Sequence, residues 1–188
     1  PAAGIRIFRS ETAKRLCGRS GCTRSACLVF DNKRPAPHRF PIMSQLHANC
    51  VQIGAHALLL RGPSGSGKSS ISLRLIDAGG CLISDDRTDL VARDGRLIAT
   101  APPTIAGLCE VRGIGIVRGL PIAAEGDVRV LIDLVADATQ VERMPHCTAE
   151  EICGITVPRW TLCATDRALD AKIRVALAVA TGEMRLEA

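Results

Sequence analysis

A chain of 188 residues, 47% of them hydrophobic, is long enough to form a single domain with a substantial core. Only 2% of the residues are aromatic, so we expect an aliphatic core. The formal charge of +5 arises in residues 1–42, where nine Lys and Arg accompany two acids, whereas residues 43–188 sum to −2. This distribution argues against a nucleic-acid-binding domain, and no apolar run reaches the ~18–20 residues that a membrane helix needs.

The nine cysteines are an odd number, and no segment has the pattern of a cleaved signal peptide. We therefore expect a cytoplasmic protein with reduced thiols. Cys17, Cys22 and Cys27 follow one another at five-residue spacing, which is wider than the usual pairs of zinc ligands, so no metal is expected there.

The chain divides at about residue 42. Residues 1–42 lack sustained periodicity and are rich in Arg, Ser, Pro and Gly, which favours disorder, although this composition also resembles that of an organelle transit peptide. Met43 opens the regularly patterned part. We expect residues 1–42 to be a disordered or non-native leader and residues 43–188 to form the folded domain.

Strands and helices alternate from Met43 onward, which predicts an α/β fold. Gly79-Gly80 is expected to end the first helix, Asp94-Gly95 to turn a hairpin, and Asp166 to cap the last helix. The predicted elements are a strand at 55–61, a helix at 68–78, a strand at 81–84, a hairpin at 90–99, strands at 109–117 and 128–135, a short helix at 148–153 and a closing helix at 166–180.

The strongest chemical signal lies between the first predicted strand and helix, where eight residues match G-x-x-x-x-G-K-[ST]. Glycines let the backbone wrap around phosphate oxygens, and the helix N-terminus favours an anion. Lys68 can reach the outer phosphates, and the Ser69 hydroxyl can ligate Mg²⁺. We therefore expect ATP and Mg²⁺ to bind here. The cofactor-binding residues are Gly62, Pro63, Ser64, Gly65, Ser66, Gly67, Lys68 and Ser69.

Two adjacent acids, Asp85 and Asp86, follow the next predicted strand. One carboxylate could ligate the metal through water, while the other accepts the proton of an attacking hydroxyl, as phosphoryl transfer requires. The sequence leaves open which aspartate has which role.

A carboxylate, a guanidinium and two glycines then occur within an apolar run, residues 110–117. Glu110 could complete the metal shell with Ser69, and the planar fork of Arg112 could hold phosphate charge. An internal ion pair between the two is the plain structural alternative.

The ordered set of these motifs resembles the catalytic domain of HPr kinase/phosphorylase over about residues 45–180. That family has a His upstream of the P-loop, an Asp-Asp pair after the next strand and a Glu-x-Arg-Gly-x-Gly signature. The counterparts here are His47, Asp85-Asp86 and residues 110–115. Arg143, in Val-Glu-Arg-Met, resembles a further arginine of the family.

The resemblance implies a P-loop-containing mixed β-sheet with flanking helices, akin to phosphoenolpyruvate carboxykinase. It implies phosphorylation of a serine on HPr, a phosphocarrier of the sugar phosphotransferase system, and removal of that phosphate with release of pyrophosphate. Asp86 would then be the base, and His47 would support the site. The resemblance also implies a homo-oligomer, of which a hexamer is the form known for relatives.

Two departures from the family pattern matter. Longer members carry a separate N-terminal domain that residues 1–42 are too short to replace, so regulation by metabolites is expected to differ. The Gly-Arg-Asn stretch that the family ties to dephosphorylation is missing, and residues 157–161 read Val-Pro-Arg-Trp-Thr. Kinase activity is therefore expected, and phosphorylase activity stays open. The alternatives are a P-loop kinase for a small molecule and a non-catalytic nucleotide-sensing module.

Overall fold

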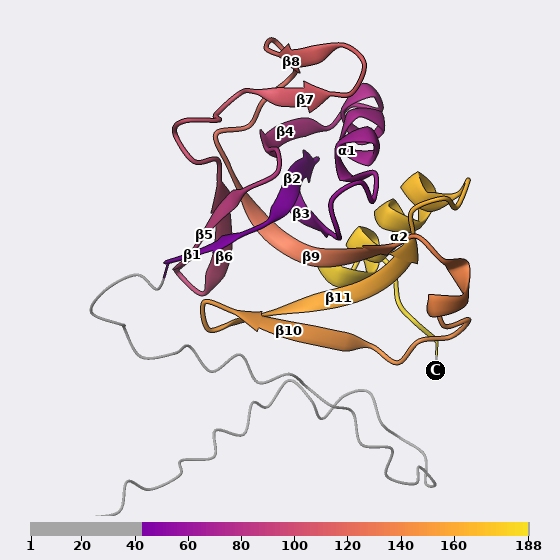
Figure 1. Cartoon of the computed structure of the whole chain (residues 1–188). Coiled ribbons are helices and arrows are strands. Elements are labelled where there is room, and N and C mark those ends of the chain that lie inside the picture. The colour runs from indigo at the N-terminus through magenta and orange to yellow at the C-terminus, as the bar shows by residue number, and fades with distance from the viewer. Residues whose placement is uncertain (1–42, 188) are drawn as a thin grey trace, which may run out of the picture. The chain divides into compact units, whose positions relative to one another are not determined.

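The computed structural model describes residues 43–187, which form a mixed β-sheet with few helices (Figure 1). The predicted leader, with Cys17, Cys22 and Cys27, lies outside the described residues. The elements are, in chain order, β1 (Met43–Leu46), β2 (Ala48–Ile53), β3 (His56–Arg61), α1 (Lys68–Asp77), β4 (Cys81–Ser84), β5 (Thr88–Arg93), β6 (Arg96–Thr100), β7 (Cys109–Val111), β8 (Gly115–Val117), β9 (Glu125–Val135), the 3-10 helix η2 (Ala138–Gln140), β10 (Thr148–Ile152), β11 (Ile155–Cys163) and α2 (Leu169–Thr181).

The principal sheet is nine-stranded and follows the order β1-β5-β6-β9-β3-β2-β4, with the β10–β11 hairpin joined to it through β9. The long strand β9 pairs with β6 through residues 125–127 and with β11 through residues 131–135. It runs parallel to β3 and β11, whereas the other pairs are antiparallel. The predicted mixed sheet is therefore confirmed.

The two faces of the sheet are covered by different elements. On one face α1 and α2 pack with Leu58 and Leu60 of β3 in a single core cluster. On the other face Ala57 and Leu59 of β3 contact a second cluster, built from β2, β5, β6, β9 and the β10–β11 hairpin. Because side chains alternate along a strand, β3 is buried on both faces, which explains its continuous apolar sequence. Both α-helices of residues 43–187 lie on one face, so the expected flanking helices cover a single side of the sheet.

The predicted first helix and first hairpin are confirmed. α1 begins at Lys68, and the turn that follows it bonds the Gly80 N–H to the Leu75 carbonyl at 2.9 Å. In the β5–β6 hairpin, Asp94 and Gly95 have φ values of 52° and 73°. Both residues are left-handed, as a type I′ turn requires.

The predicted short helix at 148–153 was wrong, because these residues form strand β10 and its turn. Cys153 and Gly154 have φ values of 52° and 79°, so they make the same kind of left-handed two-residue turn and pair β10 with β11 in antiparallel register. Burial of Ile152 and Val157 in the second core cluster favours this hairpin over a lone helical turn.

Two predicted boundaries also change. The strand expected at 109–117 is a separate two-stranded hairpin, β7–β8, because Gly113 turns the chain with a φ of 84°. The closing helix begins at Leu169, three residues after Asp166. The Asp166 carboxylate accepts a hydrogen bond from the Ala168 N–H at 2.8 Å and so lies ahead of the helix rather than capping it.

The strand order brings distant parts of the sequence together. β2 runs antiparallel to both β3 and β4, so the start of β2 lies beside the ends of β3 and β4. Residues 47–49 therefore lie close to residues 62–69, which follow β3, and to residues 85–86, which follow β4. Within residues 43–187, no helix is long and apolar enough to cross a membrane.

Candidate active site

The glycine-rich loop between β3 and α1 has the backbone geometry of a turn that leads into a helix N-terminus. Gly65 and Gly67 have φ values of 81° and 90°, which L side chains rarely adopt. Gly67 is the N-cap of α1 and provides no side chain to cap it. The first N–H groups of a helix lack partners within the helix, so they remain available to an anion.

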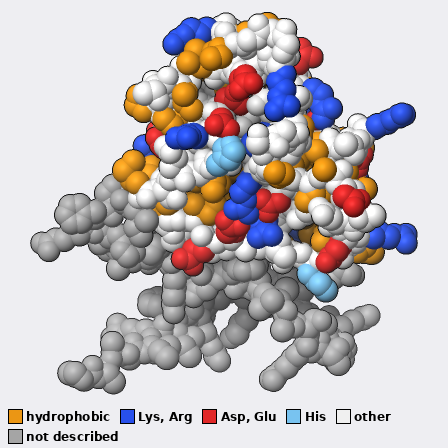
Figure 2. All heavy atoms as spheres, in the orientation of Figure 1, with side chains coloured by type: hydrophobic (Ala, Val, Ile, Leu, Met, Phe, Trp, Pro, Cys, Tyr) orange, Lys and Arg blue, Asp and Glu red, His pale blue; other side chains and the backbone are white. Residues whose placement is uncertain are grey.

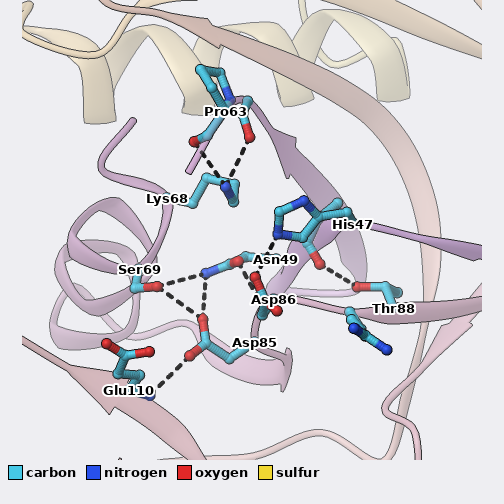
Figure 3. A network of polar contacts seen from close by, with 12 residues as sticks. His47, Asn49, Pro63, Lys68, Ser69, Asp85, Asp86, Thr88 and Glu110 are labelled. Carbon is cyan, nitrogen blue, oxygen red and sulfur yellow. Dashed lines mark hydrogen bonds and ion pairs between the residues drawn. The ribbon is translucent and has the colours of Figure 1, made fainter. Parts of the chain in front are cut away.

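Lys68 is the buried cation of this loop, with 7% of its surface exposed. Its Nζ atom donates to the carbonyl oxygens of Gly62 at 2.8 Å and of Pro63 at 3.2 Å (Figure 3). These backbone carbonyls satisfy the ammonium without neutralising it. A phosphate that entered the loop would therefore meet a positive charge held in place by its own backbone.

The Asp85 carboxylate, which is 7% exposed, points into the protein toward α1 and β7. Its Oδ1 atom accepts hydrogen bonds from Nδ2 of Asn49 at 2.6 Å and from Oγ of Ser69 at 3.0 Å. Its Oδ2 atom accepts from the backbone N–H of Glu110 at 2.9 Å. Among the described residues, no cation forms an ion pair with Asp85, so neutral donors alone hold this buried carboxylate.

Asp86 points the other way, into solvent. Its Oδ1 atom lies 2.5 Å from Nε2 of His47, and the two side chains are 64% and 55% exposed, respectively. A cavity of about 470 Å³ opens at this pair and is lined by Gln45, His47, Asp86 and Arg87. The adjacent aspartates therefore differ in environment: Asp85 is buried against the loop helix, whereas Asp86 is open to an incoming group.

Asn49 is the residue that the sequence reasoning missed. It is fully buried, and Figure 3 shows its side chain between Ser69 and the two aspartates. The available signal was a polar residue in a buried strand, two positions after His47. His47 itself lies in the bend between β1 and β2.

Glu110 lies at the start of the β7–β8 hairpin, with its backbone bonded to Asp85 and its side chain exposed. In Figure 3 its carboxylate lies on the same side of Asp85 as Ser69. The neighbouring Cys109 thiol is buried, and burial, followed by the charge of Asp85, raises its pKa to about 12.

The two predicted site arginines are not part of this cluster. Arg112 is exposed in the turn of the β7–β8 hairpin, and Arg143 is exposed in the loop before β10. Neither side chain forms a hydrogen bond or an ion pair with any described residue. The proposed ion pair between Glu110 and Arg112 is therefore not formed.

A group of four charged side chains anchors the base of the loop. Arg61, the last residue of β3, donates two hydrogen bonds to Asp133 of β9, at 2.6 and 3.0 Å, and two to Glu150 of β10, at 2.7 and 2.8 Å. Arg159 of β11 contacts the same two carboxylates. These bonds hold the pKa of Glu150 below its usual range, chiefly through the hydrogen bond with Arg61. The strand that leads into Gly62 is thus fixed to three others.

A family model, curated relatives and a solved structure all relate this chain to HPr kinase proteins. The family model described as HPr Serine kinase C-terminal domain matches residues 38–181. The chain is 43% identical to the HPr kinase/phosphorylase of Clostridium botulinum (strain Eklund 17B / Type B) over 74 residues, which are 39% of this chain and 24% of that protein. It is 33% identical to the HPr kinase/phosphorylase of Lactobacillus delbrueckii subsp. bulgaricus over 129 residues, or 63% of this chain and 41% of the relative.

The solved structure of the Hpr(Ser) kinase/phosphatase from Coxiella burnetii superposes with a TM-score of 0.67 at 29% identity, covering 75% of this chain and 92% of that one. The chain is thus a mixed-sheet domain of the class found in HPr kinase/phosphorylase enzymes. It belongs to the HPr Serine kinase C-terminal domain family. It spans about a quarter to two-fifths of the length of the curated relatives that it matches.

Proposed function

We propose that this domain is an ATP-dependent serine kinase that acts on the phosphocarrier protein HPr in the cytoplasm. The observation that carries the proposal is the opposite orientation of two adjacent carboxylates. Asp85 faces the hydroxyl of Ser69, and Asp86 faces a solvent-open cavity beside His47. Phosphoryl transfer needs one acidic group on the nucleotide side and one on the side of the attacking hydroxyl, and this turn supplies both.

The nucleotide would bind at residues 62–69. The glycine-rich turn and the N-terminus of α1 offer N–H groups to the phosphates, and Lys68 would exchange its bonds to loop carbonyls for bonds to the outer phosphate oxygens. The ammonium would then lie beside the phosphate oxygens on which negative charge develops during transfer. In that position it stabilises the transition state more than the ground state.

The donor set of the site fits Mg²⁺. Ser69 and Asp85 present oxygen atoms 3.0 Å apart, and Glu110 lies beside them. Mg²⁺ prefers oxygen ligands and is bound through one or two protein groups together with substrate phosphates. This agrees with the absence, within residues 43–187, of any group of three or more His, Cys, Asp or Glu side chains able to hold a metal unaided. Ser69 and Glu110 would hold the ion, which would neutralise phosphate charge.

The proton of the attacking alcohol would pass to Asp86. As the seryl oxygen forms its bond to the γ-phosphorus, the bond between that phosphorus and the leaving oxygen of ADP breaks, and the seryl proton moves to an Oδ atom of Asp86. Contact with His47 fixes the orientation of this carboxylate. In phosphorolysis, which we also propose, an oxygen of inorganic phosphate attacks the phosphorus of phosphoserine and the bond from that phosphorus to the serine oxygen breaks. Pyrophosphate is released, and Asp86 returns the proton to the serine oxygen.

The surface around the site favours a protein as the acceptor. The side chains of Ile114 and Ile116 are 78% and 72% exposed in the hairpin that follows Glu110. Figure 2 shows hydrophobic side chains on the surface in the region of this hairpin. Exposed apolar side chains next to a reaction site suit a macromolecular partner, which buries them on binding. We propose HPr as that partner and a homo-oligomer, such as a hexamer, as the active assembly.

The decisive experiment incubates the full chain with [γ-³²P]ATP, Mg²⁺ and purified HPr from the same cell. We expect radioactive phosphoserine on HPr. Failure to label HPr, combined with transfer to a metabolite, would identify a small-molecule kinase instead. ATP binding with no transfer to any acceptor, unchanged by Asp86→Asn, would identify a nucleotide-sensing module. Inorganic phosphate added to the labelled HPr tests the reverse reaction through release of labelled pyrophosphate.

A further inference from the structure

Asn49 is a polar side chain at a position where the strand pattern calls for an apolar one. Along β2, Val51 and Ile53 face the helices and contact the core cluster that contains α1. Residue 49 lies on the same face, because side chains alternate along a strand. Asn49 is nonetheless fully buried. Burial of an amide costs free energy unless each polar atom finds a partner, so a buried Asn here needs a reason.

Both ends of this amide are occupied. Nδ2 donates to Oδ1 of Asp85 at 2.6 Å and to Oγ of Ser72 at 3.1 Å, and Oγ of Ser69 lies 3.4 Å away. Oδ1 accepts from the backbone N–H of Asp86 at 3.0 Å. The chemistry fixes which end is which, since a carboxylate can only accept and a backbone N–H can only donate. A hydrocarbon side chain or a carboxylate could not make both contacts.

The contact with the backbone bears on the second aspartate. Asp86 has a φ of 68°, a left-handed conformation that costs free energy for any residue except glycine. The bond from its N–H to Asn49 helps to hold the turn in that state, and this conformation directs the Asp86 carboxylate to His47. One side chain therefore fixes the carboxylate of Asp85 and the backbone of Asp86.

We propose that Asn49 is a positioning residue that sets the division of roles between the two aspartates. Its amide nitrogen orients the buried Asp85 carboxylate toward the nucleotide and metal side, and its amide oxygen holds the turn that presents Asp86 to the acceptor. The link to Ser72 ties both to helix α1, the helix that follows the phosphate-binding loop. This role rests on the kinase function proposed above, although its structural part can be tested without HPr.

The test compares Asn49→Ala with Thr88→Val in the full chain. Thr88 is an equally buried polar residue, and its hydroxyl donates to the Ala48 carbonyl at 2.8 Å without contacting either aspartate. The readouts are kcat and KM for HPr, the Mg²⁺ dependence of ADP binding, the thermal midpoint, and the ring NMR signals of His47. These signals can be assigned by mutation, since the chain has only four histidines.

We expect Asn49→Ala to lower kcat about 10- to 100-fold, the range typical of outer-shell partners, with little change in KM for HPr. It should also raise the Mg²⁺ requirement of ADP binding and shift the His47 signals. Thr88→Val should lower the thermal midpoint comparably and leave kcat and the His47 signals unchanged. Asn49→Ser, which retains a hydroxyl but cannot span both partners, should give the same pattern if alanine prevents folding.

Two results would overturn the proposal. One is a folded Asn49 variant with unchanged kcat, Mg²⁺ dependence and His47 signals. The other is a loss of activity that merely follows the loss of stability in both the Asn49 and the Thr88 variants. Failure of the proposed function is a separate result: a wild-type chain that does not label HPr. In that case the His47 signals and Mg²⁺-dependent ADP binding still decide the role of Asn49.

Discussion

Nε2 of His47 lies 2.5 Å from Oδ1 of Asp86, although 39 residues separate the two along the chain. The antiparallel pairing of β2 with β4 brings them together, because it places the start of one strand beside the end of the other. The left-handed backbone of Asp86 then directs the carboxylate outward. Both residues border the cavity at which we place the acceptor hydroxyl.

Replacement of Asp86 by Asn should strongly slow phosphoryl transfer while nucleotide binding survives. Asn adopts left-handed backbone conformations more readily than most residues, so the turn should persist and only the basic oxygen is lost. General-base catalysis contributes about 10²- to 10⁴-fold, and we expect kcat to fall by that factor. Single-turnover labelling of HPr, with parallel titration of ADP, measures the two effects separately.

Asp94→Asn is the matched control, since Asp94 is also an exposed, left-handed aspartate but lies at the tip of the β5–β6 hairpin. It should leave transfer and ADP binding at wild-type values. Near-normal transfer by the Asp86→Asn variant would exclude Asp86 as the base.

Replacement of Lys68 by Ala should weaken binding of ATP and slow its turnover. Lys68 is buried and, among the described residues, donates only to backbone carbonyls, so no charge within residues 43–187 competes with a phosphate for it. Removal of one charge-assisted hydrogen bond costs about 1.5–3 kcal/mol, which corresponds to roughly 10- to 150-fold in affinity. Isothermal titration with ATP and Mg²⁺ gives this value directly.

The control for Lys68 is Lys172, which is half-exposed in α2 and pairs with Asp166. Lys172→Ala should bind ATP as the wild-type chain does. If both lysine variants bind ATP normally, residues 62–69 are not the nucleotide site.

Replacement of Gly62 by Ala should distort the entry to the loop. A Cβ atom at Gly62 would lie 2.9 Å from the Leu134 carbonyl oxygen and 2.8 Å from Oγ of Ser66. The hydroxyl can rotate away, but the backbone of β9 cannot, so we expect about 1–3 kcal/mol of destabilisation and weaker ATP binding. Urea unfolding with and without ATP measures both, and an unchanged midpoint would show that β9 yields at this point.

The motifs that could be interpreted from the sequence alone are those whose residues are adjacent in the chain. The helix that begins at Lys68 and the Asp94-Gly95 turn each depend on residues adjacent in the chain, and each has the predicted backbone. The order of the motifs, from His47 to Asp85-Asp86, was sufficient to indicate the family, because this order is visible in the sequence before the strand pairing is known.

What the sequence could not supply depends on pairing between distant strands. The sequence of residues 148–153 predicts a helix because nothing in it marks β11 as the partner strand, and the Cys153-Gly154 turn lacks the usual Asn or Asp. Arg112 lies two residues after Glu110, in the turn that follows β7, and its side chain is exposed. Asn49 was missed because its partners are 20 to 37 residues away.

Glu150 should stabilise the fold in a pH-dependent way. Hydrogen bonds from Arg61 lower its pKa from the ordinary value of 4.5. A lowered folded pKa means that the unfolded state binds the proton more tightly, so this stabilisation is fully present above about pH 4.5 and is lost as the pH falls through the folded pKa. Glu150→Gln should cost about 1–2 kcal/mol at pH 7, less than a fully buried pair would, since water still screens the site.

The cost of Glu150→Gln should shrink toward zero in acid, because the wild-type carboxylate is then protonated as well. Glu125→Gln is the control, since Glu125 also pairs with an arginine, Arg93, but both side chains are about half-exposed. An exposed ion pair contributes little, so this variant should unfold as the wild type does at both pH values. Urea unfolding at pH 7 and at pH 3.5 distinguishes the two variants. Glu150→Gln could instead lower the free energy of unfolding equally at both pH values. That result would mean that Glu150 stabilises the fold through its packing and not through the charge that Arg61 contacts.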